Sequence, residues 1–246
     1  MELLEKLYEP HTVAARGLLE TDPALCRLLD PSLKPEVLER FLIEWMARAS
    51  YMTEPVDGWI RRTGERCAEQ GMQKLGESLI THAKSETGHH MMNIEDTHAL
   101  VKLWNARHSL KLDVEALLHQ PPTEAMKEYR RIHDETIEGP HPVGQVSIER
   151  EIGYLAVAYV PRLLTRVEMV LGREIHAALT FLIEHTAVDV GHTMLNEKML
   201  KDAITRTPEN ARFYAEAGAR ALNAYIRFMG DCLRIAESQV ARPAVA

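Results

Sequence analysis

The sequence predicts a single all-helical domain. Apolar residues recur at steps of three and four, helix-breaking residues separate these stretches, and no segment alternates apolar and polar residues as a strand would. The chain has 246 residues, and 46% of them are apolar, which is enough for a sizeable core. We therefore expect one domain over residues 1–246, with a core at about 34–238 and a frayed tail at 241–246.

Five segments carry the helical period. The clearest is the last, in which Phe213, Ala217, Leu222 and Ile226 form one apolar stripe. Proline and glycine lie between most of the segments, and Pro208 suits a first helical turn. The predicted helices span 34–62, 65–107, 147–171, 174–203 and 208–238.

Two prolines fall inside these patterns. Pro55 and Pro161 should each kink or interrupt a helix, because proline removes a backbone hydrogen bond and crowds the preceding turn. Residues 105–125 have the most loop-like composition of the inner chain, with a short helix expected at Asp113–His119.

Charge and composition exclude several classes of protein. The formal net charge is −7 and no run of Lys or Arg could follow a phosphate backbone, so nucleic acid is not an expected partner. No apolar run approaches the roughly 20 residues that cross a bilayer, and the charged start lacks the pattern of a secretion signal. Three distant cysteines suggest neither a disulfide framework nor a zinc site. We expect no membrane association and a cytoplasmic location.

Two segments share an unusual pattern of metal-ligand residue types. Each reads His, three residues, an acid, one residue, Gly, His: His82-Ala-Lys-Ser-Glu86-Thr-Gly-His89 and His185-Thr-Ala-Val-Asp189-Val-Gly-His192. Positions i, i+4 and i+7 share a helix face, so each segment should direct two imidazoles and a carboxylate the same way. That ligand mixture suits iron, manganese or zinc, and the inner acid-x-x-His units match those of di-iron helical bundles.

Chance does not readily produce both segments. With 12 His and 36 acidic residues in the chain, residue frequencies give on the order of 0.1 expected matches to His-x3-acid-x2-His. A solvated polar face would explain one segment alone, but the glycine before both second histidines is harder to explain in that way. Glycine weakens a helix, and its use suggests that the backbone closely approaches another helix or a ligand there.

Further carboxylates are needed to complete a two-metal site. The sequence leaves four candidates open, and an ion pair with a nearby arginine is the competing role for each of them. They are Glu44, Glu149, Glu151 and Glu168.

These motifs resemble the heme-oxygenase-like di-iron oxidase and oxygenase superfamily, whose helical fold also hosts thiaminase-II-like proteins and pyrroloquinoline-quinone synthase. The strongest similarity is His185-x3-Asp189-x2-His192, which is similar to the late-helix ligand motif of that superfamily. The resemblance implies that Glu86 and His89 are ligands on the earlier helix, with His82 as a less usual addition. It also implies a glutamate on the middle helix, but residues 154–161 contain no acid.

The resemblance implies a heme-oxygenase-like helical bundle that binds two Fe(II) ions, activates dioxygen and oxidises or oxygenates a small substrate. Substrates in the superfamily are amino-acid-like or fatty-acid-like, and Arg162 or Arg166 could anchor a carboxylate. A homodimer is common for this kind of fold. The predicted metal ligands are His82, Glu86, His89, Glu151, Glu168, His185, Asp189 and His192.

Two other functions remain open at this point. On the same fold, the histidines and acids could act as general acids and bases in a metal-free enzyme of cofactor biosynthesis. The chain could also be a non-catalytic binding protein with incidental motifs or a structural zinc.

Overall fold

The chain folds into a bundle of α-helices with two short 3-10 helices, and no strand occurs in the part that the structure describes. In this computed structural model the described residues are 2–241, without the side chains of residues 2 and 187–190. The predicted all-helical class is confirmed. Most of the tail expected at 241–246 lies outside the described residues.

Three helices precede the range that was expected to form the core. They are α1 (Glu2–Leu7), α2 (Glu9–Thr21) and α3 (Pro23–Leu29). The carboxylate of Asp22 starts α3 by accepting hydrogen bonds from the backbone N–H groups of Ala24 and Leu25. Both α2 and α3 pack on the long C-terminal helix, so this segment belongs to the bundle.

The predicted helix 34–62 is interrupted at its proline, as expected. It forms α4 (Pro35–Thr53) and α5 (Val56–Glu69), with the break at Pro55. The prediction of one helix over 65–107 is wrong. The chain breaks twice there, after α5 and between α6 (Gln73–Glu86) and α7 (His90–Arg107). Gly71 and Gly88 have φ of 81° and 85° at these breaks, a backbone conformation that ends a helix and that glycine adopts at low cost.

The loop-like region contains the short helix that was expected, α8 (Val114–Leu118). It is followed by α9 (Glu124–Glu138), which the sequence reading did not identify. The hydroxyl of Thr123 caps α9 by accepting from the backbone N–H of Met126.

Pro161 divides the next predicted helix, as expected. The result is α10 (Gly144–Ala158) and α11 (Val160–Leu171), with the break at Tyr159. The predicted helix 174–203 begins as the 3-10 helix η1 (Arg173–Ala178) and continues as α12 (Thr180–Arg206). The last predicted helix begins as η2 (Pro208–Asn210) and becomes α13 (Ala211–Val240).

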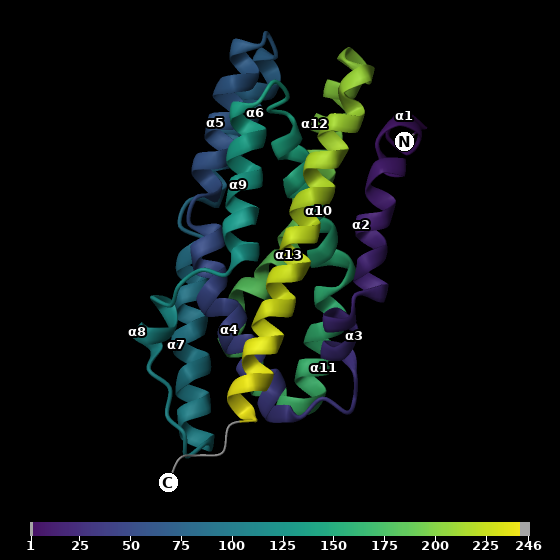
Figure 1. Cartoon of the computed structure of the whole chain (residues 1–246). Coiled ribbons are helices and arrows are strands. Elements are labelled where there is room, and N and C mark those ends of the chain that lie inside the picture. The colour runs from purple at the N-terminus through teal and green to yellow at the C-terminus, as the bar shows by residue number, and fades with distance from the viewer. Residues whose placement is uncertain (1, 242–246) are drawn as a thin grey trace.

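The long helix α13 packs against many of the other helices. It crosses the middle of the bundle, with α2 on one side and α9 on the other, and it also packs on α4 and α10 (Figure 1). Its buried face includes Phe228, Met229 and Leu222, which join Phe41 and Trp45 of α4 in the main core. No helix in the described part of the chain is long and apolar enough to cross a membrane.

The packing of α6 and α10 positions the candidate site. Helix α6 lies against α5, where Gly64 and Gly76 face each other so closely that an added Cβ on Gly76 would lie 2.5 Å from the carbonyl oxygen of Gly64. Helix α10 lies between α12 and α13 and also contacts α5. Side chains of the motif helices α6 and α12 meet beside α10.

Candidate metal centre

The first motif lies at the junction of α6 and α7. His82 and Glu86 are one turn apart on α6, with 3.9 Å between His82 Nε2 and Glu86 Oε1. The predicted single helical face does not extend to His89, because the break at Gly88 places this residue at the start of α7. Its imidazole nevertheless turns back, and Nδ1 lies 2.8 Å from Glu86 Oε2.

The second motif lies on α12. Nδ1 of His185 donates a hydrogen bond to the carbonyl oxygen of Phe181 at 2.8 Å, which leaves Nε2 with the free lone pair that a metal ligand needs. Seven residues later, His192 places Nδ1 3.6 Å from Glu86 Oε1. Asp189 lies on α12 between them, but its side chain is outside the described residues.

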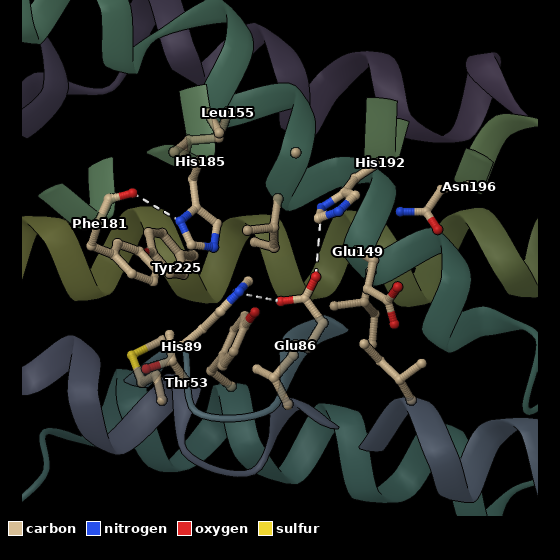
Figure 2. Close-up of a pocket in the computed structure, with 18 of the residues that line it drawn as sticks. Thr53, Glu86, His89, Glu149, Leu155, Phe181, His185, His192, Asn196 and Tyr225 are labelled. Carbon is tan, nitrogen blue, oxygen red and sulfur yellow. Dashed lines mark hydrogen bonds and ion pairs between the residues drawn. The ribbon is translucent and has the colours of Figure 1, made fainter. Parts of the chain in front are cut away.

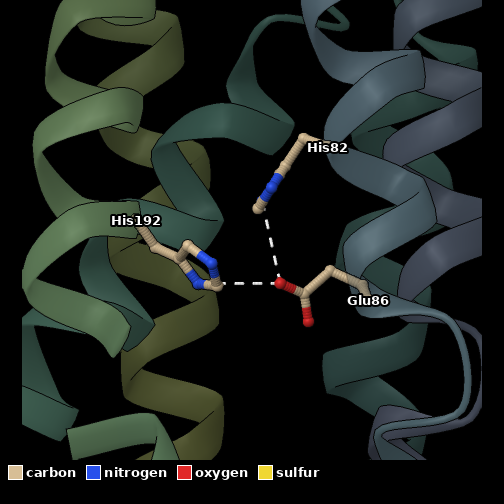
Figure 3. Close-up of side chains that lie close together, drawn as sticks. All are labelled: His82, Glu86 and His192. Atoms are coloured by element: carbon tan, nitrogen blue, oxygen red, sulfur yellow. Dashed lines mark ion pairs between the residues drawn. The ribbon is translucent and has the colours of Figure 1, made fainter. Parts of the chain in front are cut away.

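The two motifs meet at Glu86. Its Oε1 faces His82 and His192, and its Oε2 faces His89, which is beside the His185 ring (Figures 2 and 3). Two groups of potential ligands result, His82 with Glu86 and His192, and Glu86 with His89 and His185, with all ligand atoms of a group within 4.8 Å of one another. Glu86 is common to both groups, so one carboxylate could bridge two ions.

The charges around Glu86 suit this role. Burial raises the pKa of its carboxyl, but the contact with His89 and the charges of His192 and His82 outweigh burial and leave the pKa below its ordinary value. The same contact with Glu86 raises the pKa of His89. Glu86 is therefore ionised at neutral pH, as a metal ligand must be.

A further carboxylate comes from Glu149 on α10. Its Oε1 accepts a hydrogen bond from Gln145 Nε2 at 3.2 Å, and its Oε2 lies 3.6 Å from His82 Nε2. Oε2 is buried and has no hydrogen-bond partner among the described atoms, and burial raises the pKa of Glu149 to about 8. A buried carboxyl oxygen that lacks a hydrogen bond and lies beside the His82 imidazole is what a bound cation would satisfy. The residues present therefore fit a metal site.

The structure does not bring Glu151 and Glu168 to this centre. Glu151 is fully buried, but it accepts hydrogen bonds from Arg16 Nε at 2.6 Å and from the Tyr8 hydroxyl at 2.7 Å. Glu168 lies on α11 with its side chain 44% exposed, 3.7 Å from His176. Both carboxylates therefore have partners outside the His–Glu cluster.

The remaining candidate, Glu44, is also engaged elsewhere. It lies between Arg40 at 2.5 Å and Arg48 at 2.9 Å, in a buried ion-pair cluster on α4. Of the four carboxylates that the sequence left open, only Glu149 is beside the motif histidines.

A cavity of about 150 Å³ adjoins the cluster. Its lining consists of the motif histidines, Glu86, Glu149 and a larger number of apolar and aromatic side chains (Figure 2). No Lys or Arg is among its described lining residues. Arg162 pairs with Glu20 and Arg166 donates to the carbonyl oxygens of Asp30 and Pro31, so neither is placed to anchor a substrate in the cavity.

Some polar lining residues were not identified from the sequence, among them a hydrogen-bonded pair. His133 of α9 and Gln145 of α10 are joined by a 2.8 Å hydrogen bond. His133 follows Tyr129 by one turn on the buried face of α9, and that apolar spacing was the available signal. Burial lowers the pKa of His133 to about 3, so its imidazole is neutral.

A solved structure matches almost the whole chain. It is described as a domain of unknown function with a heme oxygenase-like fold from Shewanella denitrificans, with a TM-score of 0.74 and 17% identity, covering 98% of this chain and 96% of the other. The chain has a heme-oxygenase-like fold. This confirms the fold that the sequence resemblance implied.

A second solved structure also matches most of the chain. It is a CADD-like protein of unknown function from Nostoc punctiforme, with a TM-score of 0.60, 13% identity and coverage of 93% of this chain and 97% of the other. No family model and no curated protein matches the chain. At these identities the similarity shows the fold alone.

Proposed function

We propose that the chain is a non-heme di-iron oxidase or oxygenase that uses dioxygen to act on a small organic substrate in the cavity. The observation that carries this proposal is the position of Glu86, shared by two pairs of histidines at the wall of a mainly apolar cavity. Nitrogen and carboxylate ligands favour iron, with manganese or zinc as alternatives.

Each ion would have its own histidines. His82 and His192 would hold one ion and His89 and His185 the other, with Glu86 bridging them. Glu149 would bind beside His82 through Oε2, which makes no hydrogen bond. Asp189 would be a further ligand, as the sequence motif predicts. Two bound Fe(II) ions would supply the electrons that reduce dioxygen.

The chain itself would control the setting of the reaction. The Phe181 carbonyl oxygen fixes the tautomer and orientation of His185, and Gln145 fixes one oxygen of Glu149. The side chains of Trp45, Leu155 and Phe181 form apolar walls in the space beside the cluster.

Anaerobic titration with Fe(II), followed by mixing with dioxygen in a stopped-flow spectrometer, tests the proposal. We expect two irons per chain and a transient visible band. His192→Ala and His185→Ala should each lower the stoichiometry, and Glu86→Gln should weaken both sites because it removes the shared charge. His141→Ala is a matched control, because this histidine packs on Phe213 and does not line the cavity.

The outcomes distinguish the proposal from its rivals. No iron uptake would contradict it, and activity that survives exhaustive chelation would point to the metal-free enzyme. Tight zinc binding without consumption of dioxygen would point to a structural metal in a binding protein.

A further inference from the structure

His133 is a buried imidazole in the cavity wall, on the far side of Gln145 from Glu149. Its side chain is almost completely buried, its ring stacks on Trp59 with centroids 3.8 Å apart, and Tyr129 contacts it edge-on at 4.5 Å. The packing of these two rings fixes the imidazole plane. His133 belongs to neither of the two motifs, and it is not one of the proposed metal ligands.

A chain of hydrogen bonds fixes which nitrogen of His133 carries the proton. Gln145 donates through Nε2 to Oε1 of Glu149, an oxygen that accepts whether or not Oε2 carries a proton, so Gln145 Oε1 is the atom that faces His133 at 2.8 Å. An amide oxygen only accepts hydrogen bonds, and Nδ1 of His133 must therefore be the donor. Nε2 of the neutral imidazole is left as an acceptor.

That acceptor has no partner within the described chain. Nε2 of His133 is buried and makes no hydrogen bond there. Leaving a buried acceptor unpaired costs free energy, and a ligand that brings an O–H or N–H group would recover it. The imidazole lines the cavity, and because Nε2 itself is buried, a ligand that approaches from the cavity side would displace the side chains that cover this nitrogen.

The rest of the cavity limits the size and polarity of the ligand. Its volume of about 150 Å³ is similar to that of an engineered apolar cavity that holds one benzene molecule. Trp45, Met52, Phe181 and Leu182 contribute apolar walls, and no described Lys or Arg faces the ligand.

We propose that the cavity binds a neutral molecule about the size of one six-membered ring that carries a hydroxyl or amine group, and that His133 Nε2 accepts a hydrogen bond from this group. The inference that such a molecule is the substrate rests on the proposed function. The inference that the cavity prefers such a ligand does not depend on any metal. His133 would then act as a specificity-determining residue, selecting molecules with a donor over purely apolar ones.

Phenol and toluene test this, because they have the same shape and differ by a hydroxyl in place of a methyl group. Their binding to the full chain would be measured by calorimetry, both metal-free and zinc-loaded. We expect wild type to bind both, and His133→Phe to lose about tenfold in affinity for phenol while its affinity for toluene changes little. His141→Phe, which changes a histidine outside the cavity, should match wild type for both probes. Equal losses for both probes in His133→Phe, or no loss for phenol, would overturn the proposal.

Nitrogen NMR of histidine-labelled wild type gives a test that needs no variant. Nε2 of His133 should resonate as an unprotonated nitrogen and shift upfield with phenol but not with toluene. A protonated Nε2, or one that phenol leaves unchanged, would contradict the proposal. Neither experiment uses iron or dioxygen, so failure of ligand binding and failure of the di-iron function would be seen separately.

Discussion

At the scale of single residues, two carboxylates in the same cavity have opposite electrostatic surroundings. Glu86 faces three imidazoles, which keep its pKa below the ordinary value in spite of burial. Burial, with a smaller contribution from the nearby charge of Glu86, raises the pKa of Glu149 to about 8. Binding of a cation would therefore release a proton from Glu149 but not from Glu86.

Glu149 should make the metal-free protein less stable as pH rises. The folded pKa of about 8 lies above the ordinary value of 4.5, so the unfolded chain releases this proton first. The free energy of unfolding should then fall between pH 4.5 and 8, by about 1.4 kcal/mol per pH unit from this group. Glu149→Gln should remove that slope in urea denaturation measured across this pH range.

The exposed Glu168 provides the matched control. Glu168→Gln should leave the pH dependence of the metal-free protein unchanged. If Glu149→Gln also left the pH dependence of stability unchanged, the carboxyl of Glu149 would be solvated and ionised in the folded protein.

At the scale of secondary structure, the two motif glycines have different roles. Gly88 has φ of 85° and forms the break that turns His89 back toward Glu86. Gly191 lies within α12, and an added Cβ there would meet nothing within 4 Å. The surroundings of Gly191 are open, so the close approach of the backbone that the sequence suggested is absent there. Glycine is needed at position 88 because of its positive φ.

Alanine should have opposite effects at these two positions. Gly88→Ala should lower the free energy of unfolding by about 1–2 kcal/mol, because an L-residue is strained at positive φ. Gly191→Ala should raise it by up to about 1 kcal/mol, because alanine is the better helix former. Urea denaturation of the metal-free variants measures both.

Metal binding provides a second measurement on the same pair. Gly88→Ala should also weaken metal uptake by displacing His89, whereas Gly191→Ala should keep it. Equal stability of the two variants would contradict the role assigned to the break.

At the scale of the whole molecule, a buried ion-pair network fastens the N-terminal helices to α10. Arg16 donates to Glu151 through Nε and Nη2, the Tyr8 hydroxyl donates to the same carboxylate, and Arg150 reaches Glu9 at 2.8 Å. Glu151 is fully buried, so the pairing compensates its desolvation.

The homodimer and the cytoplasmic location that were expected from the sequence stay predictions.

Breaking this network should destabilise the fold without emptying the metal centre. Arg16→Met should lower the free energy of unfolding by about 3 kcal/mol, because it leaves a buried charge with fewer partners. The double variant Arg16→Met/Glu151→Leu should recover most of that loss, as thermal and urea denaturation would show. Glu151→Gln should keep the iron stoichiometry of wild type, and loss of one iron would instead make Glu151 a ligand.

The sequence by itself determined the helical class and five of the gathered side chains. Apolar spacing is a local property, so the helices at 34–62 and 208–238 and the break at Pro55 were predictable. The repeated motif likewise singled out His82, Glu86, His89, His185 and His192, which the structure brings close together.

Only the tertiary structure decided which further side chains join them. Residues 149 and 151 are about 200° apart around a helix, so only one of them can face α6 and α12. The packing of α10 against its neighbours sets that rotation, and it directs Glu149 to the histidines and Glu151 to Arg16. His133 reaches the cavity because α9 packs on α13 and α10. Such contacts depend on side chains from distant segments, and local periodicity therefore does not contain them.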